Sequence, residues 1–195
     1  MNPTLAARKA AGIPVAENLA GLAWMVKIFD DNGNAAFLSM SKGDMDDDGV
    51  EDPNVDYSTD PDHQSQTSFD PNGTWLCANN MSYFVLPGGF ATGSNARHGG
   101  VALGCLGTMI YGATGAISHG IFADVGPSSK FGEFSLEACR ELGFERVVNG
   151  QILNDGLDGE VTLLIYIGSN IGPGPVTQAQ INAAAAPLWQ AFGSP

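Results

Sequence analysis

The sequence is poor in cysteine and in long apolar runs, and each shortage excludes a class of protein. Its three cysteines, Cys77, Cys105 and Cys139, are too few and too widely spaced for a zinc motif or a dense disulfide framework. One disulfide with one free thiol stays open, and Cys139 is expected in the core because it lies beside Leu136 and Leu142 in helical spacing. No run approaches the roughly 20 apolar residues of a membrane helix, so no membrane partner is expected.

Basic residues are also scarce. The chain has 8 of them against 21 acidic residues, which gives a net charge of -13. Nucleic-acid binding needs lysine and arginine on phosphate, so no nucleic-acid partner is expected. A strongly acidic protein attracts cations and cationic polymers, although acidity that only keeps the protein soluble is the alternative.

Glycine and turn residues are what the chain has in abundance. There are 26 glycines and 11 prolines in 195 residues, and only 15% of the residues are charged. This composition favours short strands joined by tight turns, in a mainly β fold of the α+β class. We expect residues 1–20, which are alanine-rich and lack the compact apolar stretch of a signal peptide, to form an N-terminal extension, and residues 21–195 to form one domain.

Several apolar segments read as strands. The clearest is Val161–Ile167, which is β-branched, bounded by glycine and expected at the centre of the fold. Asn32-Gly33 between two apolar runs predicts a hairpin that joins Leu22–Phe29 to Ala35–Met40. Further strands are expected at Met81–Pro87, Val101–Leu106, Thr108–Tyr111 and Ala116–Ala123.

Two segments have helical patterns. Phe134–Leu142 has helical spacing and ends at Gly143. Thr177–Phe192 reads as a C-terminal helix, with Thr177 and Gln180 in the positions of a capping box. Pro187 is expected to end or kink that helix, because proline removes a backbone donor.

An acidic block opens like a calcium loop, with Asp44, Asp46 and Asp48 at alternate positions before Gly49. The twelfth position is Val55 where an EF-hand needs a bidentate glutamate, and the flanks are not helical, so an EF-hand is not expected. Three interpretations stay open: a loose surface calcium site, a groove for a cationic ligand, and a solvated acidic turn. The long polar stretch 56–70 that follows is typical of a functional loop, but His63 alone indicates nothing specific.

Two carboxylates lie at the two ends of one loop, within the stretch from Gly120 to Gly143. Asp124 follows the end of a predicted strand, and Glu133 precedes the predicted helix. A glycosidase needs such a pair, one carboxyl group to protonate the leaving oxygen and a second to act on water or on the sugar. The alternatives are a turn residue at Asp124 and a helix-dipole charge at Glu133.

This stretch resembles the core signature of the fungal-type chitosanases, glycoside hydrolase family 75. That signature runs Gly-Asp-Thr-Gly-Pro, a short loop, Ile-Gly-Glu-Ala-Ser and an alanine-rich helix ending Leu-Gly. The residues in matching positions are Asp124, Gly126, Pro127, Gly132, Glu133, Ser135, Leu142 and Gly143. Three upstream segments match in the same order: Asp46-Asp47-Asp48-Gly49; Asp60-Pro61 with Gln66-Thr67-Ser68-Phe69; and Tyr83-Phe84-Val85-Leu86-Pro87. The resemblance covers roughly residues 27–168, and one departure is Ala123-Asp124-Val125 in place of Gly-Asp-Thr.

The resemblance implies an endo-acting, inverting chitosanase. Its catalytic carboxylates would be Asp124, taken as the base, and Glu133, taken as the acid, with neither cofactor nor metal. We expect the chain to act as an extracellular monomer on chitosan, a cationic polysaccharide. The expected substrate-binding residues are Asp46, Asp48, Asp60, Gln66, Thr67 and His119, while Trp75 and Tyr83 could stack on sugars or pack in the core.

The same stretch is similar to the Asp-x-Gly-Pro motif of double-psi β-barrels, which include rare lipoprotein A, family 45 endoglucanases and expansins. This similarity implies a six-stranded double-psi β-barrel-like core with one inserted helix and a C-terminal helix. Two other functions stay open. One is a non-catalytic, expansin-like barrel that binds polysaccharide or cell wall, and the other is a calcium-stabilised structural domain, suggested only by the acidic block.

Overall fold

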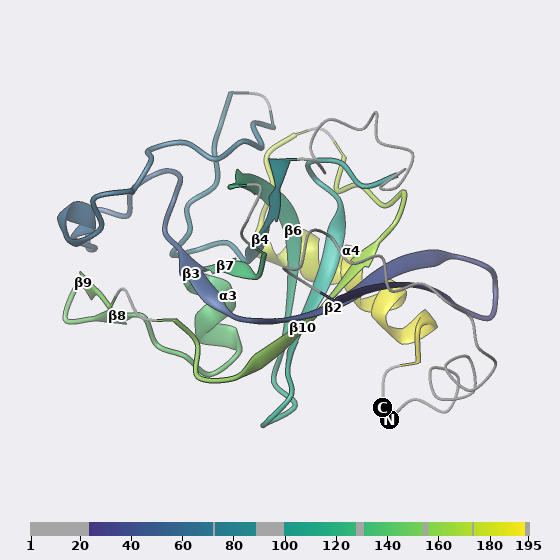
Figure 1. Cartoon of the computed structure of the whole chain (residues 1–195). Helices are drawn as coiled ribbons and strands as arrows, with labels where there is room; N and C mark the ends of the chain where they lie inside the picture. Colours follow the sequence, from purple (N-terminus) through teal and green to yellow (C-terminus); the bar gives the residue numbers. More distant parts are fainter. Residues whose placement is uncertain are drawn as a thin grey trace.

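One mixed β-sheet organises the chain (Figure 1). The computed structural model describes residues 24–71, 73–88, 100–127, 131–153, 156–172 and 174–193, so the expected N-terminal extension at residues 1–20 lies outside the described residues. The sheet contains β1 (Trp24–Phe29), β2 (Ala35–Lys42), β3 (Asp44–Asp46), β4 (Tyr83–Pro87), β5 (Leu106–Tyr111), β6 (Ile117–Gly126), β7 (Glu133–Ser135) and β10 (Glu160–Tyr166). A separate two-stranded hairpin consists of β8 (Val147–Val148) and β9 (Gln151–Ile152).

The expected six-stranded double-psi barrel is wrong. The sheet is open and has eight strands in the order β1-β2-β10-β5-β6-β4-β7-β3, and its two end strands, β1 and β3, form no ladder with each other. Pairing between strands that are remote in sequence decides closure, and no local motif fixes that pairing. Only Gly43 separates β2 from β3. The continuous segment that contains both strands therefore pairs with β10 through β2 and with β7 through β3.

Most expected strands are present. The hairpin at Asn32-Gly33 is confirmed: β1 and β2 pair antiparallel, and Gly33 has the positive φ of 85° that the turn requires. The strand expected at Val161–Ile167 is β10, which is bonded on both sides, to β2 and β5. The two strands expected at residues 101–106 and 108–111 are instead the single strand β5, whose first residue is Leu106.

Two α-helices lie within the described residues. The inserted helix is α3 (Leu136–Glu141), which begins after the cap residue Ser135. The C-terminal helix α4 (Gln178–Ala191) lies across β5 and β6 (Figure 1), and the predicted capping box of Thr177 and Gln180 is confirmed. Neither of the two described helices has the length and apolar character needed to cross a membrane.

Pro187 does not end α4, which continues to Ala191. Proline in a helix removes one backbone hydrogen bond. Ile181 and Ala185 are completely buried on the inner face of α4, so its packing against the sheet holds the helix through the proline.

The buried side chains of the described residues form one core cluster. Phe84, Phe122 and Phe134 are each fully buried and lie side by side on β4, β6 and β7. Cys139 is fully buried, as expected, and none of the three cysteines forms a disulfide.

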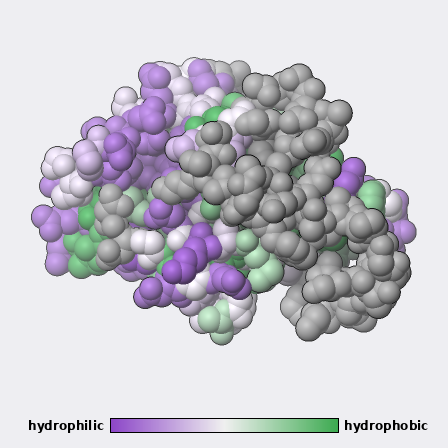
Figure 2. All heavy atoms as spheres, in the orientation of Figure 1, coloured by the Kyte–Doolittle hydropathy of each residue, from purple (hydrophilic) through white to green (hydrophobic). Residues whose placement is uncertain are grey.

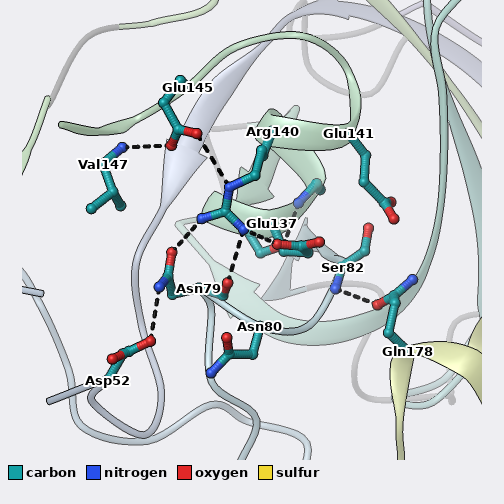
Figure 3. Close-up of polar contacts among 12 residues, drawn as sticks. Asp52, Asn79, Asn80, Ser82, Glu137, Arg140, Glu141, Glu145, Val147 and Gln178 are labelled. Carbon is teal, nitrogen blue, oxygen red and sulfur yellow. Dashed lines mark hydrogen bonds and ion pairs between the residues drawn. The ribbon is translucent and has the colours of Figure 1, made fainter. Parts of the chain in front are cut away.

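A long connection from residue 47 to residue 82 joins β3 to β4, and its described residues contain one 3-10 turn, Tyr57–Thr59. Figure 3 shows how it is tied to α3: Arg140 Nη2 donates to Asn79 Oδ1 (2.6 Å), and Asn79 Nδ2 donates to Asp52 Oδ2 (2.9 Å). Arg140 also forms an ion pair with Glu137 on its own helix. Hydrophilic side chains gather over the part of the molecule that this connection occupies (Figure 2).

Candidate active site

Strand β4 aligns the two carboxylates that the sequence singled out. Its residue Val85 pairs with Asp124 on β6 and with Glu133 on β7. Paired residues of neighbouring strands project from the same face of a sheet. Asp124 and Glu133 therefore flank Val85 on one face of the sheet. Phe84 and its two partners, Phe122 and Phe134, fill the core on the other face.

A β-bulge produces this arrangement. The register between β4 and β6 shifts after Phe84. Phe84 pairs with Phe122, but the next residue, Val85, pairs with Asp124. Ala123 is therefore the extra residue on β6. In a regular strand Asp124 would share the face of Phe122, which is the core, because side chains alternate with a period of two. The bulge turns Asp124 to the opposite face.

The spacing of strands sets the distance between the two residues. Two strand intervals of about 4.8 Å place the Cα atoms of Asp124 and Glu133 about 9.5 Å apart. The Glu133 side chain leans back toward β6, since its Oε2 lies 2.8 Å from the position that a Cβ on Gly126 would occupy. Gly126 lies two residues beyond Asp124, about 6.6 Å along the strand.

These residues lie on a cleft of about 450 Å³. Its lining comprises Asp44, Met45, Asp46, Asp47, Asp48, Asp60, Asp62, Gln64, Val85, Asp124, Val125, Gly126, Pro127 and Glu133. Eight of these described residues are carboxylic acids and none is lysine or arginine. The cleft therefore carries a concentrated negative charge and suits a ligand with several positive charges.

Asp124 is held by the long connection. Its Oδ1 accepts hydrogen bonds from the backbone N–H of Ser68 (2.9 Å), from Ser68 Oγ (2.5 Å) and from the N–H of Val125 (2.8 Å). The side chain is buried to 7% exposure. Three donors on one oxygen fix the orientation of the carboxylate.

Asp46, Asp48 and Asp124 bring carboxylate oxygens within 4.8 Å of one another. Burial, with the charges of Asp48 and Asp124, raises the pKa of Asp46 well above its usual range. Burial raises the pKa of Asp48 to about 7, and the Asp124 charge and a hydrogen bond to Asp124 act in the same direction. Like charges this close disfavour one another, so the cluster tends to retain a proton.

Tyr83 supports this cluster from the core. Its hydroxyl donates to Asp46 Oδ1 (2.9 Å) and lies 2.8 Å from the backbone oxygen of Asp48. Tyr83 is fully buried, so the idea that it stacks on a sugar is wrong.

The structure brings five of the eight predicted site residues together at the cleft: Asp46, Asp48, Asp60, Asp124 and Glu133. Gln66 is exposed and lies outside the cleft lining. Thr67 is buried, where its hydroxyl donates to the Phe69 carbonyl and accepts from the N–H of Leu76.

His119 lies on β6 and outside the cleft lining. Its Nδ1 is 2.9 Å from Thr108 Oγ1, and burial lowers the pKa of the imidazole. The contacts of His119 and Thr67 are internal to the fold, and their predicted role in substrate binding stays a prediction.

The sequence left unassigned Ser68, which holds Asp124, and the cleft residues Asp44, Asp47, Gln64 and Val85. Ser68 is within the segment that carries the resemblance, but its contact with Asp124 spans 56 residues of sequence. The alternating acids do not arrange themselves as in an EF-hand, because Asp46 and Asp48 converge on Asp124.

No family model matches the chain, and no curated protein matches it. A function for this chain therefore rests on the residues of the cleft and on the sequence resemblance described above.

Proposed function

We propose that this chain is an endo-acting chitosanase, which hydrolyses β-1,4 glycosidic bonds of chitosan with inversion. Glu133 is the general acid and Asp124 is the general base. The observation that supports this best is their placement in register on either side of Val85, at an acidic cleft. Inverting glycosidases need two carboxyl groups about 6.5–9.5 Å apart. The Cα atoms of these two residues lie about 9.5 Å apart by strand spacing, which leaves room for a water molecule between their side chains.

In the proposed reaction, Glu133 donates its proton to the glycosidic oxygen as the bond from that oxygen to the anomeric carbon breaks. Asp124 removes a proton from a water molecule, whose oxygen attacks the anomeric carbon from the opposite face. The reaction leaves Glu133 ionised and Asp124 protonated, and proton exchange with solvent restores both. Ser68 keeps Asp124 aimed at the water through its two hydrogen bonds.

The charge of the cleft supports the choice of substrate. Chitosan carries protonated amines along its length, and each can pair with a carboxylate. Asp60 and Asp62 extend the negative surface away from the catalytic pair along the long connection. A neutral glucan would leave these carboxylates without partners.

The test is a reducing-end assay on chitosan with the wild-type chain, Asp124→Asn and Glu133→Gln. Each variant is expected to lose about 10²–10⁴-fold in kcat, because each removes one proton-transfer group. Asp158→Asn, a change at an exposed acid, is the matched control and should retain wild-type activity. The first product released should be the α-anomer, detected by proton NMR during the reaction.

Two outcomes would overturn this proposal. If the wild-type chain binds chitosan but releases no reducing ends, the chain is a non-catalytic polysaccharide-binding protein. If both variants keep full activity, another pair of groups carries the chemistry.

A further inference from the structure

A histidine of the long connection, His63, sits among carboxylates, two of which, Asp47 and Asp48, line the cleft. His63 Nδ1 lies 3.5 Å from Asp47 Oδ1 and 4.0 Å from Asp48 Oδ1. Its other ring nitrogen, Nε2, lies 3.7 Å from Glu51 Oε1. Donor atoms of Asp47, Asp48 and His63 all lie within 4.8 Å of one another.

These polar groups are buried without hydrogen bonds. The His63 side chain is 10% exposed, and neither of its ring nitrogens makes a hydrogen bond. The Asp47 side chain is 4% exposed, and its Oδ2 likewise has no hydrogen-bond partner. Buried polar atoms are almost always satisfied, because an unsatisfied one retains the full cost of its desolvation. Unpartnered buried atoms on two residues of one cluster, His63 and Asp47, indicate a missing ligand.

The excess of negative charge around His63 also indicates a missing cation. Asp47, Asp48 and Glu51 surround a single imidazole, and the charge of Asp60 also acts on Asp47. Even a protonated His63 would neutralise only one of these four carboxylates. A divalent cation between Asp47 and Asp48 would offset two of these negative charges.

We propose that Asp47, Asp48 and His63 bind one divalent transition-metal cation of the zinc class. An imidazole nitrogen with two carboxylate oxygens is a ligand set that zinc accepts, whereas calcium and magnesium take oxygen ligands. Bonds of 2.0–2.1 Å in tetrahedral geometry put the donor atoms about 3.3 Å apart, so the observed separations need to contract by an ångström or so. Water or a ligand would fill the fourth position.

The surroundings hold these three ligands in place. Glu51 faces the nitrogen of His63 that points away from the cation, as an outer carboxylate does in many zinc sites. The Tyr57 ring packs on the imidazole with a centroid distance of 4.5 Å. Asp48 Oδ1 accepts the N–H of Gln64 (2.6 Å), which joins the two segments that supply the ligands.

This inference is independent of the proposed hydrolase activity, and its test has no activity readout. The full chain is stripped of metal with a chelator, dialysed and titrated calorimetrically with zinc chloride. We expect one zinc ion per chain, with saturation below about 100 µM. We also expect Co²⁺ to give the intense visible band of a tetrahedral site.

The variants locate the ligands. His63→Ala and Asp47→Asn should each lower zinc affinity at least about 30-fold, and Glu51→Gln by about 10-fold. His119→Asn changes an imidazole outside the site and should leave the affinity unchanged. Asp48→Asn provides a second ligand variant if His63→Ala does not fold.

Three results would overturn the inference. One is that no zinc binds to the wild-type chain at 100 µM and its Tm does not rise. Another is that folded His63→Ala or Asp48→Asn binds zinc as the wild type does. The third is that calcium displaces zinc at equal concentration, which would mean that the imidazole is not a ligand.

Discussion

Asp124 and Glu133 face one cleft because both pair with Val85, one from β6 and the other from β7. Their separation is a property of the sheet, with one strand between them, rather than of the loop that connects them in sequence. A sheet fixes the distance between two residues more precisely than a loop does, and acid–base catalysis depends on precise positions.

Gly126→Ala should displace the Glu133 carboxylate. The new Cβ would lie 2.8 Å from Glu133 Oε2 and 2.9 Å from Val85 Cγ1, which is too close for both. A shift of about 1 Å in a catalytic group can cost about 10²-fold, so we expect kcat for chitosan to fall by that order with KM little changed. Gly88→Ala is the control, because its Cβ would meet Val125 at an ordinary 3.6 Å. Unchanged kcat in Gly126→Ala would mean that Glu133 need not lie over β6.

Ser68→Ala should impair the base without removing it. The change deletes the hydroxyl that donates to Asp124 Oδ1, while the two backbone donors remain. A hydrogen bond to a charged group contributes about 1.5–3 kcal/mol, so we expect kcat to fall about 10–100-fold. Ser58→Ala removes an exposed hydroxyl of the same connection and should be silent. Equal kcat for the two variants would contradict the orienting role of Ser68.

Salt should weaken substrate binding. Attraction between the acidic cleft and a cationic polymer is screened as ionic strength rises, so KM for chitosan should increase between about 0.05 and 0.5 M sodium chloride. The double change Asp60→Asn and Asp62→Asn should raise KM at low salt and flatten its salt dependence, with kcat retained. A KM that does not respond to salt would show that charge does not recruit the substrate.

His119 should lower stability in acid. Burial lowers the pKa of folded His119, so below the unfolded pKa of about 6.5 the unfolded chain binds more protons than the folded chain. The free energy of unfolding therefore falls as the pH decreases below about 6.5. Above that pH, the titration of His119 does not affect stability. His119→Asn keeps a polar group near Thr108 but cannot be protonated. The stability of this variant relative to the wild type, measured by urea unfolding, should rise from pH 7 to pH 5, and a constant difference would contradict the prediction.

Arg140→Ala should loosen the long connection. The guanidinium donates to both the side chain and the backbone oxygen of Asn79, at 2.6 and 3.2 Å (Figure 3). Its loss should cost about 1–3 kcal/mol in the free energy of unfolding and increase amide exchange near Asp52. Glu145→Gln weakens an exposed ion pair at 3.4 Å and retains an amide oxygen that can accept from the Val147 N–H, so it should cost less than about 0.5 kcal/mol. Equal costs for the two variants would mean that Asn79 does not anchor the connection.

Local chemistry was enough to predict several elements. Asn32-Gly33 predicted the β1–β2 hairpin because few residues adopt the positive φ that its turn needs. Thr177 and Gln180 predicted the start of α4, since both partners of a capping box lie within one turn. Local reasoning allowed Pro187 either to end or to kink this helix, and the ending was wrong, because packing against the sheet maintains the helix to Ala191.

The sequence by itself determined which residues are available for chemistry: a pair of carboxylates near a turn, a run of acids and a shortage of cations. Tertiary structure alone decided what they do together. The bulge at Ala123 turns Asp124 from the core to the cleft, and pairing with Val85 places Glu133 beside it. The open order of the sheet, and the meeting of His63 with Asp47 and Asp48, likewise depend on contacts between segments remote in sequence. Such contacts are selected by the packing of the whole core, which no short stretch of sequence contains.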